Sequence, residues 1–218
     1  MSVNLYLLST PGEGDIRYII DTCRPHLQSQ AEPLVAYLPW ASTGNDWLSY
    51  TQQAFAGLAS VAGLDPARGS LAENERILDQ CGIVYIPGGN TYLLNHRLHE
   101  SGLFEALQPR ALGGLPMVGF SAGAIVCGPN ILTTHDINLL PTCHFDSLNL
   151  LPYNLVAHYP AEDLRREHED DWLSDYHVMH TNPILALEDG ACVHWNGETL
   201  ERVRGTTWML EPGKLRAP

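Results

Sequence analysis

The 218-residue sequence has no long apolar run, no paired cysteines and no surplus of basic residues. No apolar stretch approaches the roughly 18 residues that a membrane-spanning helix needs. The first residues carry neither a basic segment nor a usable cleavage site of the kind found in secretory signals. We therefore expect a cytoplasmic protein with no membrane partner.

The cysteine and charge balances exclude further classes of protein. The five cysteines are scattered, odd in number and without any C-x-x-C pair, which argues against a disulfide framework or a structural zinc site. The 25 acidic residues outnumber the 12 Lys and Arg and give a formal net charge of −13. Because nucleic acids attract basic surfaces, we expect no nucleic-acid partner. An acidic surface that maintains solubility explains this charge, which permits a cationic ligand without requiring one.

The sequence does contain alternating strand and helix patterns of ordinary globular composition, with 44% hydrophobic and 17% charged residues. Ser70 followed by Glu73 is typical of a helix capping box. Repeated βα units predict an α/β protein with a mostly parallel twisted sheet and helices on both faces, in one domain over residues 1–218. The expected strands are 3–8, 33–38, 83–86 and 115–120, and the expected helices are 16–27, 47–61, 71–80, 92–99 and 103–112.

The second half of the chain is less regular. Residues 129–160 suggest loops and short strands before an apolar run that ends at His158, and residues 161–176 look like an exposed helix. A strand fits 184–187. Apolar segments on either side of Asn196-Gly197 predict a C-terminal β-hairpin with a type I′ turn, with a further strand at 206–210.

A nucleophile elbow is the first candidate for chemistry. An apolar run enters Gly119-Phe-Ser-Ala-Gly123 and then small, helix-compatible residues, which predicts strand, sharp turn and helix. The two glycines allow the strand and the helix to approach without Cβ clashes. Ser121 would then present its hydroxyl at the carboxyl end of the sheet, and the Ala122 N–H could bind an oxyanion.

A second glycine motif follows the strand at 83–86. The backbone N–H of Gly88 or Gly89 could supply the second oxyanion donor, and Asn90 or Thr91 would cap the next helix. Because ligand sites of parallel sheets lie beyond the carboxyl ends of the strands, we expect the two motifs to form one site.

Together, Ile86-Pro-Gly-Gly-Asn-Thr91 and Gly119-Phe-Ser-Ala-Gly-Ala124 closely resemble peptidase E, the aspartyl dipeptidase family. The likeness extends to the segments Thr133-Thr-His-Asp136 and Leu155-Val-Ala-His158. The resemblance implies a flavodoxin-like fold of the class I glutamine amidotransferase type. It also implies a serine exopeptidase that cleaves after the N-terminal aspartate of short peptides, through an acyl-enzyme and without a cofactor.

The hydroxyl of Ser121 needs a base, and that base needs an orienting acid. Spacing alone does not choose among the ten histidines, of which His135, His144, His158 and His180 lie in loops or at strand ends. The resemblance to peptidase E implies His158. It also implies an acid before a glycine after a later strand.

That position holds Asp189, with Glu188 as the alternative and Asp136 as a third candidate. Peptidase E is known for glutamate there, so Asp189 departs from the family pattern. Without the nucleophile elbow, Glu188-Asp189-Gly190 would be interpreted as a solvated turn.

The resemblance further implies a cation for the substrate's β-carboxylate and acceptors for its ammonium group. Arg166, with Arg165 as the alternative, is the candidate cation, although both also fit a salt-bridged helix surface. Asn90, Thr91 and Asp136 are the other candidate substrate-binding residues, and turn hydrogen bonds equally explain Asp136. The loop between His158 and these arginines looks shorter than in the family's best-known members, which would relax the preference for aspartate.

Three further expectations complete the sequence analysis. Pairs such as His135-Asp136 or His177 with His180 lack a full ligand set, so we expect no metal. Cyanophycinase-like cleavage of another small amide, or a non-catalytic binding or stress-response role, are the alternative functions. The oligomeric state stays open, with a homodimer as one candidate.

Overall fold

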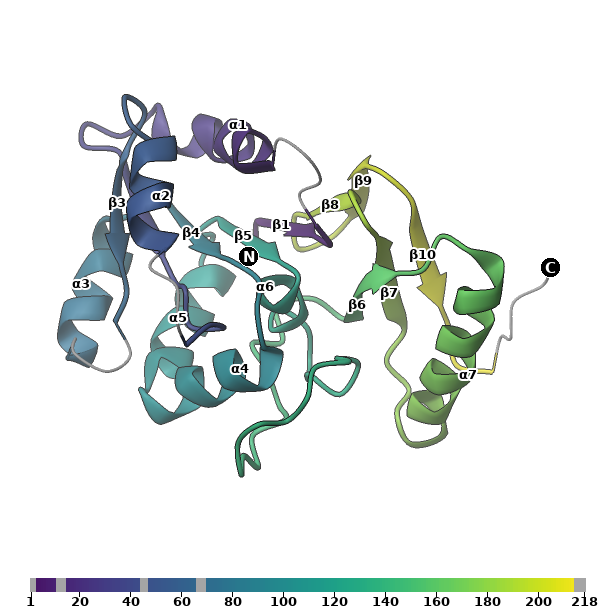
Figure 1. The fold of residues 1–218 in the computed structure, drawn as a ribbon. Coiled ribbons are helices and arrows are strands. Elements are labelled where there is room, and N and C mark those ends of the chain that lie inside the picture. Colours follow the sequence, from purple (N-terminus) through teal and green to yellow (C-terminus); the bar gives the residue numbers. More distant parts are fainter. Residues whose placement is uncertain (1–2, 11–14, 44–46, 66–69, 214–218) are drawn as a thin grey trace.

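The structure is a computed structural model, which describes residues 3–10, 15–43, 47–65 and 70–213 (Figure 1). Strands and helices alternate through its first half, as the sequence predicts. The elements are β1 (Leu5–Leu8), α1 (Asp15–Leu27), β2 (Leu34–Tyr37), α2 (Trp47–Ala54), β3 (Ser60–Gly63), α3 (Leu71–Gln80), β4 (Ile83–Ile86), α4 (Thr91–Glu100), α5 (Leu103–Leu112), β5 (Met117–Phe120), α6 (Ala122–Ile125), β6 (Asn154–Tyr159), α7 (Asp163–Met179), β7 (Ile184–Glu188), β8 (Cys192–Trp195), β9 (Leu200–Arg204) and β10 (Thr207–Leu210).

The main sheet has seven strands in the order β3-β2-β4-β5-β1-β8-β9. The five strands from β3 to β1 run parallel, whereas β8 and β9 add an antiparallel hairpin at one edge. This confirms the expected mostly parallel sheet and the C-terminal hairpin. All parallel strands therefore direct their carboxyl ends to the same edge.

Helices cover both faces of this sheet, with α1 and α2 on one side and α3, α4, α5 and α6 on the other (Figure 1). Side chains of β4 alternate between the two cores: Ile83 and Tyr85 pack on the α1 side, and Val84 and Ile86 on the other. A strand buried on both faces reads as a continuous apolar run, which is why the sequence identifies β4 so clearly.

A smaller sheet of order β10-β7-β6 lies beside the main one and packs against α7 (Figure 1). Strands β6 and β7 are parallel, and β10 is antiparallel to β7. Its core contains Val156, Tyr159, Leu173 and Ile184, all nearly inaccessible to solvent. This sheet carries two of the candidate site residues, because His158 lies in β6 and Asp189 directly follows β7.

Two local predictions are wrong. The expected helix 47–61 ends at Ala54, and Ser60–Gly63 forms the edge strand β3. Gly57 has a φ of 82°, which interrupts the helix, and the chain then pairs in parallel with β2. The β8–β9 turn is also different, because Trp195 pairs with Leu200 and leaves a four-residue loop instead of a two-residue type I′ turn.

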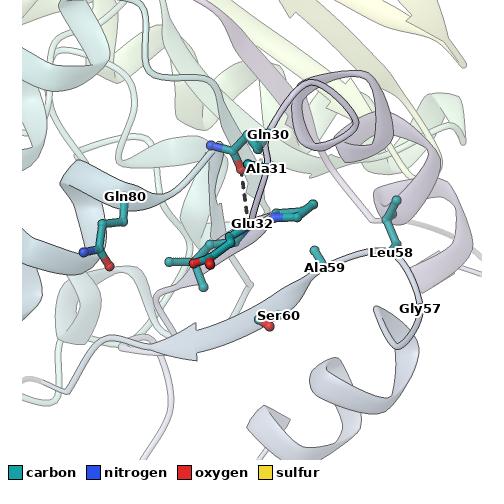
Figure 2. A pocket seen from close by; sticks show the side chains of 10 residues that line it. Gln30, Ala31, Glu32, Gly57, Leu58, Ala59, Ser60 and Gln80 are labelled. Carbon is teal, nitrogen blue, oxygen red and sulfur yellow. Dashed lines mark hydrogen bonds between the residues drawn. The ribbon is translucent and has the colours of Figure 1, made fainter.

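All five cysteines are free, as expected. Figure 2 shows an open hollow at the amino ends of β2 and β3, lined by Gln30, Ala31, Glu32, Pro33, Leu34, Gly57, Leu58, Ala59, Ser60 and Gln80. In the described part of the chain, no helix is both long and apolar enough to cross a membrane.

Candidate active site

Ser121 occupies a strained turn between β5 and α6. Its φ of 50° and ψ of −113° are unusual for a residue with a side chain. Its N–H donates to the carbonyl oxygen of Leu8 at 2.9 Å, and its own carbonyl accepts from the N–H of Ala124. These bonds hold the turn on neighbouring strand β1 and on the first turn of α6.

The flanking glycines are required by close backbone contacts. A Cβ added at Gly119 would lie 2.3 Å from the carbonyl oxygen of Gly123, and one added at Gly123 would lie 2.1 Å from that of Ile86. No side chain fits at either position. The elbow that the spacing predicts is therefore present in the backbone.

Ser121, His158 and Asp189 form a continuous hydrogen-bonded chain. Ser121 Oγ lies 3.0 Å from His158 Nε2, and His158 Nδ1 lies 2.8 Å from Asp189 Oδ1. The side chains of His158 and Asp189 are 49% and 66% exposed, so a substrate can reach them from solvent. When Nδ1 carries the ring proton and donates it to Asp189, Nε2 is free to accept the serine proton.

Ser9, directly after β1, supports this chain, and the sequence analysis missed it. Its hydroxyl accepts the backbone N–H of His158 at 2.7 Å and donates to Asp189 Oδ1 at 3.2 Å, while the residue is fully buried. His158 has a φ of 60° beside an irregularity in β6, so its backbone needs such an anchor. No pattern in the sequence marks Ser9, because its burial and its contact with His158 arise only from the fold.

Glu188, the alternative acid, has other partners. Its carboxylate accepts from the indole N–H of Trp208 at 2.9 Å and lies 3.7 Å from the guanidinium of Arg166. Only 14% of its side chain is exposed. The structure therefore brings Asp189, and not Glu188, into contact with His158.

The glycine pair after β4 borders the elbow. A Cβ at Gly88 would lie 3.1 Å from Ser121 Cβ, so the Gly88 backbone lies directly against the serine. Gly89 has a φ of 140°, and a Cβ there would lie 2.5 Å from the carbonyl oxygen of Ala41. The Ala122 N–H belongs to the first residue of α6, next to Ser121. Gly88 and Ala122 therefore lie directly beside Ser121, and Gly89 is the residue that follows Gly88.

Asn90, Thr91 and Asp136 form a hydrogen-bonded junction at the start of α4. Asn90 caps the helix through Leu93 N–H and donates to the carbonyl oxygen of Ile137. Asp136 accepts the Thr91 N–H at 2.6 Å and also contacts the Thr134 hydroxyl. As the third candidate acid, Asp136 lies in this junction, and its hydrogen bonds are those of a helix cap.

The two candidate arginines differ in exposure. Arg166 is 12% exposed, lies between Asp163 and Glu188, donates to two carbonyl oxygens after β6 and packs over the Trp208 ring. Arg165 is 77% exposed and pairs with Glu162. Both arginines therefore form ion pairs with neighbouring carboxylates, as the alternative interpretation of a salt-bridged helix expects.

The other candidate histidines contact groups outside the Ser121 chain. His135 pairs with Glu169, His144 with Glu100, and His180 stacks on Tyr176. The hydrogen bond with Glu169 raises the pKa of His135, against an opposing effect of burial.

Comparison with known proteins identifies the family. The model of peptidase family S51 matches residues 5–203. The chain belongs to this family. This S51 chain is 31% identical over 205 residues to Peptidase E of Streptomyces coelicolor, which covers 90% of the chain and 82% of the relative. It is 29% identical over 224 residues to Peptidase E of Shewanella denitrificans, and this alignment covers 98% of the chain and 93% of the relative.

Solved structures agree with the S51 fold. A Listeria monocytogenes protein described as a candidate peptidase E aligns with a TM-score of 0.73 at 23% identity, over 94% of this chain and 100% of that one. A peptidase from an acI-B1 actinobacterium aligns with a TM-score of 0.72 at 14% identity, over 98% of this chain and 96% of that one. Family membership makes this S51 chain a serine peptidase.

Proposed function

We propose that this S51 peptidase hydrolyses the peptide bond after an N-terminal aspartate in short peptides, with Ser121 as nucleophile, His158 as base and Asp189 as orienting acid. The hydrogen-bonded chain from Ser121 Oγ through the imidazole to Asp189 is the observation that carries this proposal. A serine at a strained elbow beside a histidine and a carboxylate is the arrangement that acyl transfer requires.

The reaction begins when His158 Nε2 accepts the Ser121 proton and Oγ attacks the carbonyl carbon of the first residue. The Ala122 N–H and that of Gly89 or Gly88 would hold the resulting oxyanion. The imidazolium then protonates the departing amine, the C–N bond breaks, and an acyl-enzyme remains on Oγ. Water, deprotonated by His158, releases the aspartate and restores the serine. Asp189 keeps the Nδ1 proton in place throughout.

A dipeptide panel that varies the first residue before a constant leucine tests the activity and its specificity. We expect Asp-Leu to be cleaved preferentially, and Ser121→Ala to lower kcat by about four orders of magnitude or more. Equal cleavage of the whole panel would favour the relaxed, cyanophycinase-like alternative. Cleavage that persists in Ser121→Ala would contradict the nucleophile assignment.

Two variants test the acid. Asp189→Asn should lower kcat by about 10³ to 10⁴, because the amide stabilises the wrong imidazole tautomer and no longer balances the imidazolium charge. Glu188→Gln is the matched control and should retain most of kcat, since Glu188 contacts Trp208 and Arg166 and not His158; any effect through Arg166 should appear in KM. The reverse order of losses would reassign the acid to Glu188.

We further propose Arg166 as the cation for the substrate's β-carboxylate. Its guanidinium lies beside the carbonyl oxygens of Pro160 and Ala161, two and three residues after His158. Substrate would replace Asp163, whose side chain is 92% exposed and easily displaced. Asn90, Thr91 and Asp136 would shape the side of the site near the glycine pair, with Asp136 as acceptor for the ammonium group.

Arg166→Ala should lower turnover of Asp-Leu much more than that of Ala-Leu, with Arg165→Ala as the matched control on the exposed surface of α7. Equal losses on the two substrates would remove the proposed role of Arg166. A selective loss in Arg165→Ala would transfer the role to Arg165.

A further inference from the structure

A second group of ionisable side chains lies at the C-terminal end of α4, away from Ser121. His96, Glu100 and His144 each direct one ligand atom into a common space, and these atoms all lie within 4.8 Å of one another. Nε2 of His144 is 3.2 Å from Oε1 of Glu100. Two imidazoles and one carboxylate are a donor set that zinc and similar divalent metals use.

The sequence places the first two ligands together by helix geometry. His96 and Glu100 are four residues apart on α4, so they share one face of the helix. His144 comes from the irregular segment before β6, and its carbonyl oxygen accepts a hydrogen bond from the buried amide of Asn95 at 3.1 Å. Asn95, which directly precedes His96, therefore holds the backbone of His144 beside α4.

Neighbouring groups orient the His144 ring. His99 stacks on it with ring centroids 4.5 Å apart, and the Nε2 of His99 is 3.0 Å from the carbonyl oxygen of Asp146. Such supporting contacts hold a metal-binding imidazole in one orientation. The side chains of His144 and Glu100 are 35% and 59% exposed, which leaves a route for an ion from solvent.

His96 supplies the observation that points beyond an ordinary ion pair. Its Nδ1 is buried and has no hydrogen-bond partner within the described ranges. Buried polar atoms are nearly always satisfied, and an exception calls for an explanation. A histidine–glutamate pair between His144 and Glu100 leaves His96 without a role in the cluster, although one of its ring nitrogens lies within 4.8 Å of both partners' ligand atoms. A bound ion would give this imidazole a partner. The carbonyl end of a helix also favours a cation.

We propose that His96, Glu100 and His144 bind a divalent transition-metal ion of the zinc type, with water completing the coordination. Zinc bonds of about 2.0–2.2 Å place tetrahedral ligand atoms roughly 3.4 Å apart. The ligand atoms must therefore approach one another by up to about 1.4 Å, which rotamer adjustments of the exposed Glu100 and the partly exposed His144 allow.

The ion would fasten the segment around His144 to α4. Thr91 and Glu100 are the two ends of α4, so the metal would lie roughly 14 Å along the helix from Thr91 at about 1.5 Å per residue. The same irregular segment contains Asp136, which binds the Thr91 N–H at the other end. The site is therefore structural and supplies no group to the reaction at Ser121.

Calorimetric titration of chelator-treated, untagged protein with Zn²⁺ tests the proposal, with visible absorption of Co²⁺ as a second measurement. We expect one equivalent to bind, a rise in the melting temperature, and a Co²⁺ spectrum of low coordination number. Glu100→Gln, His144→Ala and His96→Ala should each weaken binding by about tenfold or more, the range that loss of even a supporting contact causes.

His168→Ala is the matched control because His168 is an exposed histidine of α7 and should leave the affinity unchanged. Glu100→Gln keeps the proposal testable if a histidine variant does not fold, since its side chain is largely exposed. Equal zinc affinity and equal Co²⁺ spectra in wild type and Glu100→Gln would overturn the proposal. Binding is measured without substrate, so its failure is separate from that of the proposed hydrolase activity.

Discussion

At the scale of single residues, the candidate active site depends on two side-chain-bearing residues with positive φ, Ser121 and His158. Each such residue costs about 1–3 kcal/mol of backbone strain. Leu8, the last residue of β1, and Ser9, which follows it, stabilise both, because the Leu8 carbonyl accepts the Ser121 N–H and the Ser9 hydroxyl accepts the His158 N–H. The carboxyl end of β1 therefore holds the backbones of Ser121 and His158, the proposed nucleophile and base, near each other.

Ser9→Ala should separate this positioning role from catalysis itself. The variant removes the acceptor of the His158 N–H and the donor to Asp189, and bonds to charged groups are worth about 1.5–3 kcal/mol. We expect kcat to fall about tenfold to a hundredfold with little change in KM, measured on Asp-Leu. A wild-type kcat, or a loss in KM alone, would show that Ser9 does not position the pair.

At the scale of elements, the contact between α6 and β4 depends on Gly123. Gly123→Ala forces a Cβ to within 2.1 Å of the Ile86 carbonyl oxygen, so α6 must move. We expect a loss of unfolding free energy of about 2–4 kcal/mol and a misplaced Ser121, measured by urea unfolding and turnover.

Gly57→Ala is the matched control for Gly123→Ala. Gly57 has a positive φ, whereas Gly123 does not, and an added Cβ at Gly57 meets nothing within 4 Å. Its cost should be only the strain of about 1–2 kcal/mol, with turnover unchanged. Equal losses of stability in the two variants would exclude the contact as the reason for glycine at position 123.

The packing of α7 on the irregular segment includes a pH-sensitive contact between His135 and Glu169. Its hydrogen bond raises the pKa of His135 above the ordinary 6.5. The contact therefore stabilises the fold fully below that value, and the stabilisation is lost as pH rises through the raised pKa. His135→Gln should lower the melting temperature clearly at about pH 6 and little at about pH 9.

Glu169→Gln is the partner variant for this contact and should show the same pH dependence, while the double variant should lose little more. A melting-temperature difference between wild type and His135→Gln that is constant with pH would contradict the assignment.

The elements that the sequence predicted are those with a local cause. Strand β4 is a continuous apolar run, α3 carries a capping box at Ser70, and the elbow needs its glycines. The sequence predicted no strand at β3 and extended a helix over its first two residues, because its four residues carry no strong pattern. Pairing with β2 stabilises this edge strand, and that tertiary effect is invisible in the local sequence.

The candidate site was only partly predictable for the same reason. The turn spacing indicated Ser121, whereas family resemblance, not spacing, selected His158 from ten histidines. Ser9 reaches His158 across 149 residues, and no sequence pattern marks that contact. His96 and His144 likewise meet only after α4 and the irregular segment pack together.

At the scale of the whole molecule, the proposed active site joins two sheets. The main sheet supplies Ser9 and Ser121, and the smaller one supplies His158 and Asp189 (Figure 1). Three of the four lie at or just after the carboxyl end of a strand, where all parallel strands open toward solvent. His158 lies inside β6 at its irregularity and reaches the same place by its unusual φ.

The net charge of −13 should affect how substrates reach this site. An Asp-Leu dipeptide carries two carboxylates and one ammonium group, so it is repelled over a Debye length of about 30 Å at 10 mM salt and about 10 Å at 100 mM. We expect kcat/KM for Asp-Leu to rise about twofold or more over this range. Asp-Leu-amide, which has no net charge, is the control and should respond little. A fall in kcat/KM for Asp-Leu with added salt would instead show that attraction by a nearby cation such as Arg166 outweighs the repulsion by the rest of the protein.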